Sequence, residues 1–270
     1  MHLPDTVSAF ADDVLHEADG RPLAVDYELR LDVSGCIIDV ATNDGPLFEK
    51  LLRYFAELIV GDGAPAGDHG TPDFRIVCIE GPTLDLDVDW TVKQPEPGKT
   101  KIKEEWVNLP DGRVVRKRVT GMVFAFGGDL HLGFGPCREN DNQVINFVNN
   151  RYMQWRLAQG FVLAHAGAVA RDGRCLAMCG PSGAGKSTAA LGLVGDGLDF
   201  VSNDRLLLRA NERGVEVHGI PKHPRVNPGT ILFNPMLKEM IPEEERAQLL
   251  ALPSDELREL EQKYDVLIDE

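Results

Sequence analysis

Apolar and polar residues alternate along residues 24–33, AVDYELRLDV, which is the pattern of a strand with one buried face. The apolar positions of this strand are Val25, Tyr27, Leu29, Leu31 and Val33. Short runs of the same kind follow at residues 74–79, 84–91, 101–107, 113–119, 122–126 and 129–134, separated by turn residues such as Pro110-Asp111-Gly112. One helix is predicted over residues 46–60, where apolar residues recur at helical spacing. The first half therefore predicts a mostly antiparallel sheet packed on a helix.

The second half changes pattern after residue 138, so we predict two domains, residues 1–138 and 139–270. A helix is predicted from Asp141 to Gly160, with Val144, Val148, Tyr152 and Trp155 on one face. Strands flank Asp172-Gly173, and a helix ends near residues 195–197. A strand ending at residues 203–204, a hairpin over 205–220 and a helix over 243–264 follow. The predicted fold class is α/β for this domain and α+β for the whole chain. The closing segment DVLIDE is typical of an unfinished strand, which predicts that the sequence stops short of the natural domain.

The chain has 28 Lys+Arg against 43 Asp+Glu, a formal net charge of −15. An acidic surface repels nucleic-acid backbones and anionic membranes, so neither is an expected partner. Residues 113–118 are basic, but on strand positions they favour a solvated sheet edge. The N-terminus lacks the pattern of a signal peptide, and no apolar run is long enough to span a bilayer. The five cysteines, Cys36, Cys78, Cys137, Cys175 and Cys179, show no C-x-x-C spacing, so we expect buried thiols and a cytoplasmic protein.

Residues 180–187, GPSGAGKS, fit the pattern G-x-x-x-x-G-K-[ST], with a strand-like run before them and a helical run after them. We call this segment the glycine-rich loop. Such a loop turns backbone N–H groups toward phosphate oxygens, its lysine reaches the terminal phosphates and its serine hydroxyl binds Mg²⁺. The predicted ligands are ATP and Mg²⁺. The predicted nucleotide-binding residues are Gly180, Ser182, Gly183, Ala184, Gly185, Lys186, Ser187 and Thr188.

Two residues on neighbouring segments are candidates for chemistry beside this loop. If Asp172-Gly173 is a two-residue turn, Arg171 pairs with Arg174 and His165 lies opposite Gly180. Asp204 follows the next strand, where a carboxylate can bind Mg²⁺ or accept a proton. The alternatives are a histidine that caps a strand end and an aspartate that caps a turn.

The segments AHAGAV, DG, GPSGAGKST and VSND, within residues 160–230, resemble the catalytic domain of the HPr kinase/phosphorylase family, in particular the HPr kinase-related proteins. That family is similar in fold to the phosphoenolpyruvate carboxykinase group. The resemblance implies a Mg²⁺-dependent phosphoryl transferase, with His165 and Asp204 near the transferred phosphate and Ser187 and Asp204 as metal ligands. Two features depart from the family: Asn203 replaces the first member of its acidic pair, and the first half of the chain is unlike the usual N-terminal domain. HPr as acceptor and the reverse phosphorolysis therefore stay open.

The loop after the second hairpin adds three cations, Lys222, His223 and Arg225, between prolines. A stiff basic loop suits an anionic substrate or the transferring phosphate, and a solvated loop is the alternative. We assign Arg225, with Asp204, His165 and Lys186, to the catalytic set. The predicted function is ATP- and Mg²⁺-dependent transfer to an acceptor hydroxyl, on a protein serine or a small molecule; the alternative is a nucleotide-binding regulatory module with little or no transferase activity. Base preference and homo-oligomerisation stay open.

Overall fold

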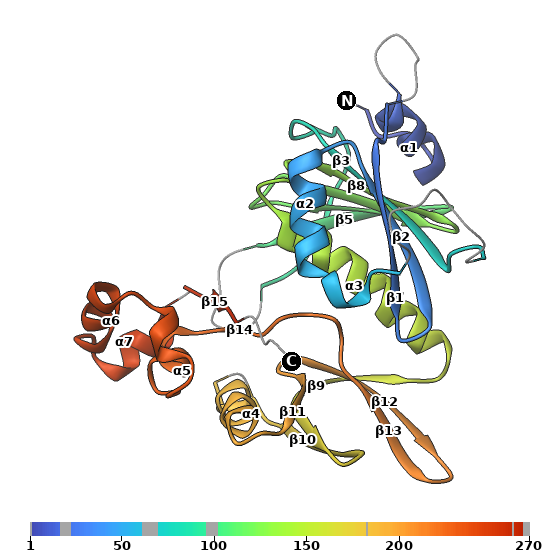
Figure 1. Ribbon diagram of the computed structural model, residues 1–270. Coiled ribbons are helices and arrows are strands. Elements are labelled where there is room, and N and C mark those ends of the chain that lie inside the picture. Colours follow the sequence, from blue (N-terminus) through green and yellow to red (C-terminus); the bar gives the residue numbers. More distant parts are fainter. Residues whose placement is uncertain are drawn as a thin grey trace. The chain divides into compact units, whose positions relative to one another are not determined.

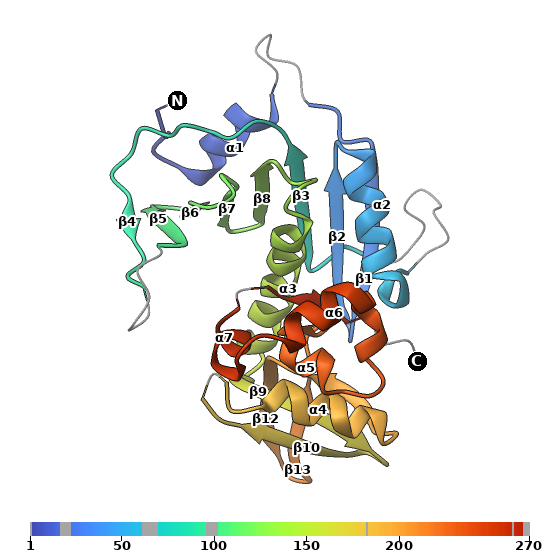
Figure 2. The same cartoon turned by 90° about the vertical axis from the view of Figure 1, so that its left-hand side faces the viewer.

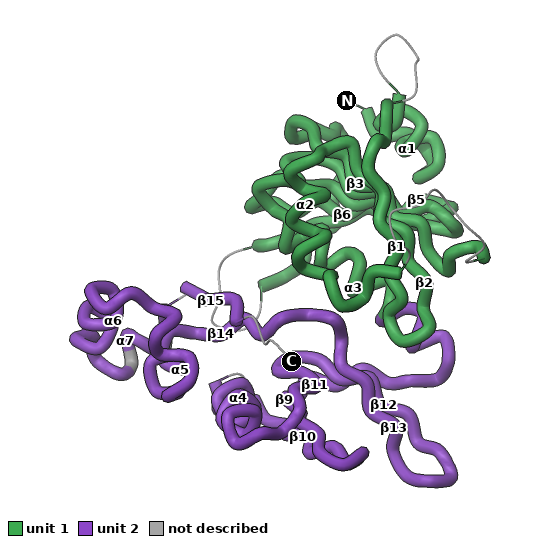
Figure 3. Tube along the Cα trace, in the orientation of Figure 1, with its two compact units in different colours: residues 1–152 green, residues 153–270 purple. Residues whose placement is uncertain are grey.

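The computed structural model describes residues 2–16, 23–60, 70–95, 102–181, 183–260 and 262–266. The chain forms two compact units, an N-terminal unit of residues 1–152 and a C-terminal unit of residues 153–270 (Figure 3). The division lies inside helix α3 (Asp141–Ala158), whereas the sequence places a boundary ahead of that helix. Each unit combines helices with its own sheet, so the protein is α+β.

The N-terminal unit contains an eight-stranded mixed sheet (Figure 1). Its strands β2 and β3 pair in parallel, as do β3 and β8, and the other neighbours are antiparallel. The sheet is thus mixed, with its parallel pairs around β3. In spatial order the strands are β1 (Tyr27–Val33), β2 (Cys36–Thr42), β3 (Phe74–Glu80), β8 (Leu130–Gly135), β7 (Val123–Gly127), β6 (Gly112–Lys117), β5 (Glu104–Leu109) and β4 (Thr91–Val92).

The sequence did not predict the parallel pairs, because its pattern did not identify β2 as a strand. Its sequence, CIIDVAT, is almost entirely buried and shows no alternation, so the period-2 signal is missing. Helix α2 (Gly45–Tyr54) then carries the chain from β2 to the parallel strand β3. The helix begins where the Asp44 carboxylate accepts a hydrogen bond from the Leu47 N–H at 2.8 Å.

Helices cover both faces of the part of the sheet around β7. Val123 and Ala125 belong to the core cluster that contains Phe10 of α1 (Val7–Leu15). Phe124 and Phe126, on the alternate positions of β7, pack their rings against Phe147 of α3. This two-sided burial explains why the β7 segment is apolar at every position, and Figure 2 shows the helices beside the sheet seen from its end.

Two predictions for this unit are wrong, and one helix was not predicted. Residues 84–90 form no strand; Asp87 only bridges His2, and pairing resumes at β4. The basic segment 113–118 is not a sheet edge, because β6 lies between β5 and β7. Helix α1 was missed, since its N-terminal N–H groups are bound partly by the distant Asp111 carboxylate, which accepts from Val7 N at 2.7 Å.

The C-terminal unit is built on a second sheet whose described pairs are all antiparallel. It is therefore α+β and not an alternating α/β unit with a parallel sheet. Helix α4 (Lys186–Gly195) packs on β9, β10 and β11. The strand order is β10 (Arg174–Cys179), β9 (Val162–Arg171), β12 (Arg205–Asn211) and β13 (Gly214–His218), with β11 (Asp199–Ser202) also paired to β9.

The last part of the chain packs short helices against α4. The predicted helix over residues 243–264 is wrong, because Pro253 interrupts it between α6 (Glu243–Leu250) and α7 (Ser254–Glu259). Together with α5 (Pro228–Leu232), these helices share a core that includes Leu191 of α4. The two-residue strands β14 (Arg225–Val226) and β15 (Tyr264–Asp265) pair beside them, and residues 267–270 lie outside the described part of the chain.

The cysteines do not all behave as buried thiols. Cys36, Cys78 and Cys137 are buried, and burial raises the pKa of Cys78 to about 12. Cys175 and Cys179 are exposed, because they lie on β10, which is an edge strand of its sheet. Among the described residues, every helix is too short or too polar to cross a bilayer.

Candidate functional site

The glycine-rich loop connects β10 to α4 in a tight ring. Gly183 and Gly185 have φ values of 80° and 86°, which L side chains rarely adopt, so both positions require glycine. The Ala184 N–H donates to the Pro181 carbonyl at 3.2 Å and closes the turn between them. Ser182 lies outside the described residues. The predicted strand–loop–helix context of the motif is thus present.

Lys186 is the first residue of α4, and its side chain folds back over the loop. The ammonium donates to the carbonyl oxygens of Gly180 and Pro181, at 2.8 and 3.0 Å. The first hydrogen bond of the helix runs from Ala189 N to Gly185 O, so the N–H groups of residues 186–188 lack acceptors within the helix. The first turn also holds no acidic residue. A lysine ammonium and a helix N-terminus therefore face the same place, which is the arrangement that binds phosphate.

Strand β9 passes directly against the first turn of α4. A Cβ at Gly167 would lie 3.3 Å from the carbonyl oxygen of Lys186, tighter than nearly all real Cβ contacts. Glycine in the HAGAV segment thus lets the strand approach the helix. The hairpin register is the predicted one: Arg174 pairs with Arg171, and Cys179 pairs with Ala166. This register brings the strand residue before Ala166, His165, to the level of the loop.

Asp204 lies at a break between β11 and β12, which pair with successive parts of β9. The Ser202 hydroxyl oxygen accepts from the N–H groups of Asp204 and Arg205, at 3.2 and 3.1 Å, and so holds the break. The Asp204 carbonyl accepts from Ala166 N at 3.1 Å. Backbone contacts on both sides therefore fix the carboxylate beside β9.

His165 and Asp204 form a pair. The His165 Nδ1 and the Asp204 Oδ1 are 3.1 Å apart. The Arg205 Nε lies 4.0 Å from the other carboxylate oxygen, Asp204 Oδ2. The two side chains are 59% and 37% exposed, so neither is turned into the core. Because Arg205 pairs with His165 across the strands, the sheet itself brings the pair together. An accessible carboxylate with an imidazole at hydrogen-bond range is suited to accept a proton.

Asn203, next to Asp204, connects this break to the glycine-rich loop. Its amide Nδ2 donates to the Ser187 hydroxyl at 3.3 Å, and the residue is 9% exposed. Because Asn203 and Asp204 are consecutive, this contact brings the two predicted Mg²⁺ ligands, Ser187 and Asp204, to neighbouring positions. The described residues contain no group of three His, Cys, Asp or Glu that could hold a metal. A Mg²⁺ ion would fit here only with phosphate and water oxygens completing its shell, which is how proteins usually bind it.

Of the basic loop, Lys222 lies close enough to Asp204 for the two charges to interact. Burial lowers the pKa of the Lys222 ammonium, Asp204 opposes that shift, and Arg205, Arg225 and Lys263 lower the pKa further. Three other cations and one aspartate therefore act on the Lys222 charge. The sequence grouped Lys222 with His223 and Arg225 as cations for an anionic substrate but did not assign it to the catalytic set, because only the fold brings it near Asp204.

Arg225, which the sequence assigned to the catalytic set, is held by another partner. It begins β14 and its Nε lies 3.4 Å from the Asp265 carboxylate of β15. Its charge still acts on Lys222. Thr188, the last predicted nucleotide-binding residue, makes a 3.0 Å hydroxyl contact with Thr230 of α5, which joins the start of α4 to the C-terminal helices.

Comparisons of the chain with protein-family models, with curated proteins and with solved structures find no match.

Proposed function

We propose that the C-terminal unit catalyses ATP- and Mg²⁺-dependent phosphoryl transfer to an acceptor hydroxyl, as its resemblance to the HPr kinase/phosphorylase family implies. The observation that carries the proposal is the break at residues 202–204. On one side it places the His165–Asp204 pair, and on the other it reaches the Ser187 hydroxyl through Asn203. Two consecutive residues, Asn203 and Asp204, therefore connect the glycine-rich loop to the proposed proton acceptor.

Each residue has a defined task in this proposal. Lys186 and the amides that open α4 bind the terminal phosphates of ATP, and Ser187 and Asp204 are the protein ligands for Mg²⁺. The metal would supply charge neutralisation between the phosphate oxygens. Asp204, oriented by His165, accepts the proton of the acceptor hydroxyl. Lys222 lies beside Asp204 and offsets the negative charge that collects there, with Arg225 as a more distant cation.

The experiment compares wild type with Asp204→Asn in full-length protein. Label from the γ-phosphate of ATP is followed into the protein and metabolite fractions of a cell extract, and MgATP affinity is measured by calorimetry. Asp204→Asn keeps the size of the side chain but loses its charge and basicity, so transfer should fall on the order of 10²-fold or more. Nucleotide affinity should fall only modestly, because Lys186 and the loop amides remain.

Asp199→Asn is the matched control, since Asp199 is an exposed residue at the start of β11, the strand that precedes Asp204. It should transfer label like wild type, and His165→Ala should show an intermediate loss. If Asp204→Asn transfers label at the wild-type rate, or if wild type binds MgATP and labels nothing, the phosphotransferase is refuted. The second result favours the regulatory nucleotide-binding module.

A further inference from the structure

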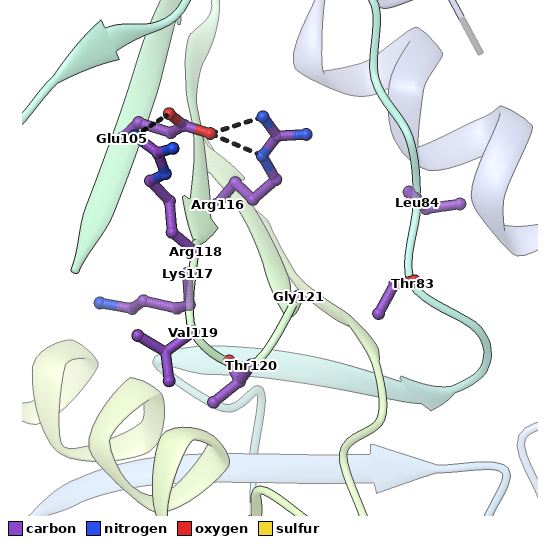
Figure 4. A pocket seen from close by; sticks show the side chains of 9 residues that line it. All are labelled: Thr83, Leu84, Glu105, Arg116, Lys117, Arg118, Val119, Thr120 and Gly121. Atoms are coloured by element: carbon purple, nitrogen blue, oxygen red, sulfur yellow. Dashed lines mark hydrogen bonds and ion pairs between the residues drawn. The ribbon is translucent and has the colours of Figure 1, made fainter. Parts of the chain in front are cut away.

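The N-terminal unit contains a pocket of about 400 Å³ that plays no part in the proposed function. Its lining comes from strand β5, from the end of β6 with the turn after it, and from a separate segment at residues 83–84 (Figure 4). Ligand pockets in proteins have volumes of roughly 300–1,000 Å³, so this one can hold a small organic molecule. The lining residues are Thr83, Leu84, Glu105, Arg116, Lys117, Arg118, Val119, Thr120 and Gly121.

The charge on the pocket wall is positive in a chain whose net charge is −15: three cations line it against one carboxylate. Figure 4 shows the Glu105 carboxylate between the guanidinium groups of Arg116 and Arg118, with Lys117 extending away from both. Lys117 is paired with Glu104, which also accepts from Lys93 at 2.6 Å. Among the residues that line the pocket, cations therefore outnumber carboxylates three to one.

The two arginines differ in how firmly they are held. Arg116 donates from Nε to Glu105 at 2.7 Å, and its guanidinium lies 4.5 Å from the centre of the Trp90 ring. Arg118 reaches the same carboxylate only at 3.8 Å, beyond hydrogen-bond range, and its side chain is 46% exposed. Arg116 therefore neutralises the buried Glu105, whereas the half-exposed Arg118 guanidinium lies within ion-pair range of the same carboxylate and can also contact an anion in the pocket.

The turn after β6 gives the pocket a fixed floor. Gly121 has a φ of 73°, and a Cβ there would lie 2.3 Å from the Thr83 side chain, so the turn and the segment at residues 83–84 are in close contact. Thr83 and Thr120 are part of the lining, and the Thr120 hydroxyl oxygen accepts from Met122 N at 3.4 Å. Val119, which is 61% exposed, adds apolar surface. A guanidinium group next to apolar surface suits a phosphate attached to an organic body.

We propose that this pocket is a binding site for a small phosphorylated metabolite, with Arg118 as the main phosphate ligand. The charge excess selects an anion, and the planar fork favours a phosphate group. The volume is several times the roughly 30 Å³ that one water occupies in the liquid, so it also accommodates the organic body. This site is independent of phosphoryl transfer at the glycine-rich loop.

The test uses full-length protein carrying Lys186→Ala, so that the glycine-rich loop does not contribute phosphate binding. Ribose 5-phosphate, AMP and inorganic phosphate are titrated by calorimetry. At least one organic phosphate should bind with one site per chain and more tightly than inorganic phosphate. Adding Arg118→Ala should weaken that binding at least tenfold. Arg113→Ala is the matched control, because Arg113 lies on β6 outside the pocket, bonded to Asn108, and should leave binding unchanged.

A second variant addresses the pocket without removing an arginine. Val119→Glu places a carboxylate on an exposed position of the wall, so the fold is kept and the anion is repelled. It should abolish binding while the thermal midpoint stays close to that of the parent. The proposal is overturned if none of the three probes binds, or if binding survives both Arg118→Ala and Val119→Glu.

Discussion

Asn203→Asp tests whether the described geometry contains a metal site, because it adds a carboxylate next to Ser187 and Asp204. In the structure Asn203 is 9% exposed and its Nδ2 donates to the Ser187 hydroxyl at 3.3 Å. In the variant this hydrogen bond is reversed, since the serine hydroxyl can turn and donate to the new carboxylate. The main change is therefore a buried negative charge close to that of Asp204.

The cost of that charge can be estimated from its burial. A buried group without adequate partners costs about 1–3 kcal/mol, and more when it is charged. For a protein of this size, 1 kcal/mol corresponds to roughly 2–4 °C in the thermal midpoint, so we expect a decrease of about 2–12 °C without metal. A cation at contact distance attracts a carboxylate by about 4 kcal/mol per unit charge at an effective dielectric constant near 20. Mg²⁺ with ATP should therefore recover most of the decrease.

The assay is thermal unfolding of wild type and variant in chelator and in Mg²⁺ with ATP. The control is Asn227→Asp, the same substitution at an exposed position before α5. The difference in midpoint between Asn203→Asp and wild type should shrink with MgATP, whereas the Asn227→Asp difference should be the same in both buffers. An Asn203→Asp difference that MgATP leaves unchanged refutes the assignment of Ser187 and Asp204 to the metal.

Three further predictions follow from particular contacts. Lys186→Ala should remove most MgATP affinity, measured by calorimetry; unchanged affinity contradicts the assigned loop. Lys222→Gln should lower the rate of phosphoryl transfer more than Arg225→Gln, because the Lys222 charge interacts with Asp204 whereas Arg225 is paired with Asp265. If a transfer assay gives the reverse order, Arg225 returns to the catalytic set. A hydrogen bond from Arg138 holds the pKa of Asp44 below its usual value. The interaction therefore stabilises the fold above the pKa of an unfolded aspartate, about 4, and this stabilisation is lost as the pH falls through the pKa of Asp44 in the folded protein. Arg138→Ala should lower the free energy of unfolding at pH 7 by up to about 1 kcal/mol, since the arginine is half-exposed, and this difference should vanish in acid; urea titrations that show no difference at pH 7 contradict it.

The sequence by itself determined the features that depend on neighbouring residues. Asp172-Gly173 forms the hairpin turn and thereby fixes the register that brings His165 to the loop. The glycines at 183 and 185 have the positive φ that the loop requires, and α4 ends at Gly195 as predicted. The strand that precedes Asp204 is also present, although it ends at Ser202, just before the predicted end at residues 203–204. Turn chemistry and helix termini involve residues a few positions apart, so a local pattern is sufficient to predict them.

Only the tertiary structure decided which distant segments meet. Strand β2 has no alternation because both of its faces are covered, and its parallel partner, β3, is remote in sequence. The sequence of residues 113–118 predicts an exposed sheet edge, but in the fold β6 lies between β5 and β7. The pocket at the end of β6 depends on this position of the strand. Lys222 lies near Asp204 in the folded chain, although the two are 18 positions apart in the sequence. Arg225 instead pairs with Asp265. Burial on a second face, strand neighbours and charge pairing are properties of the folded chain, and no short window of the sequence contains them.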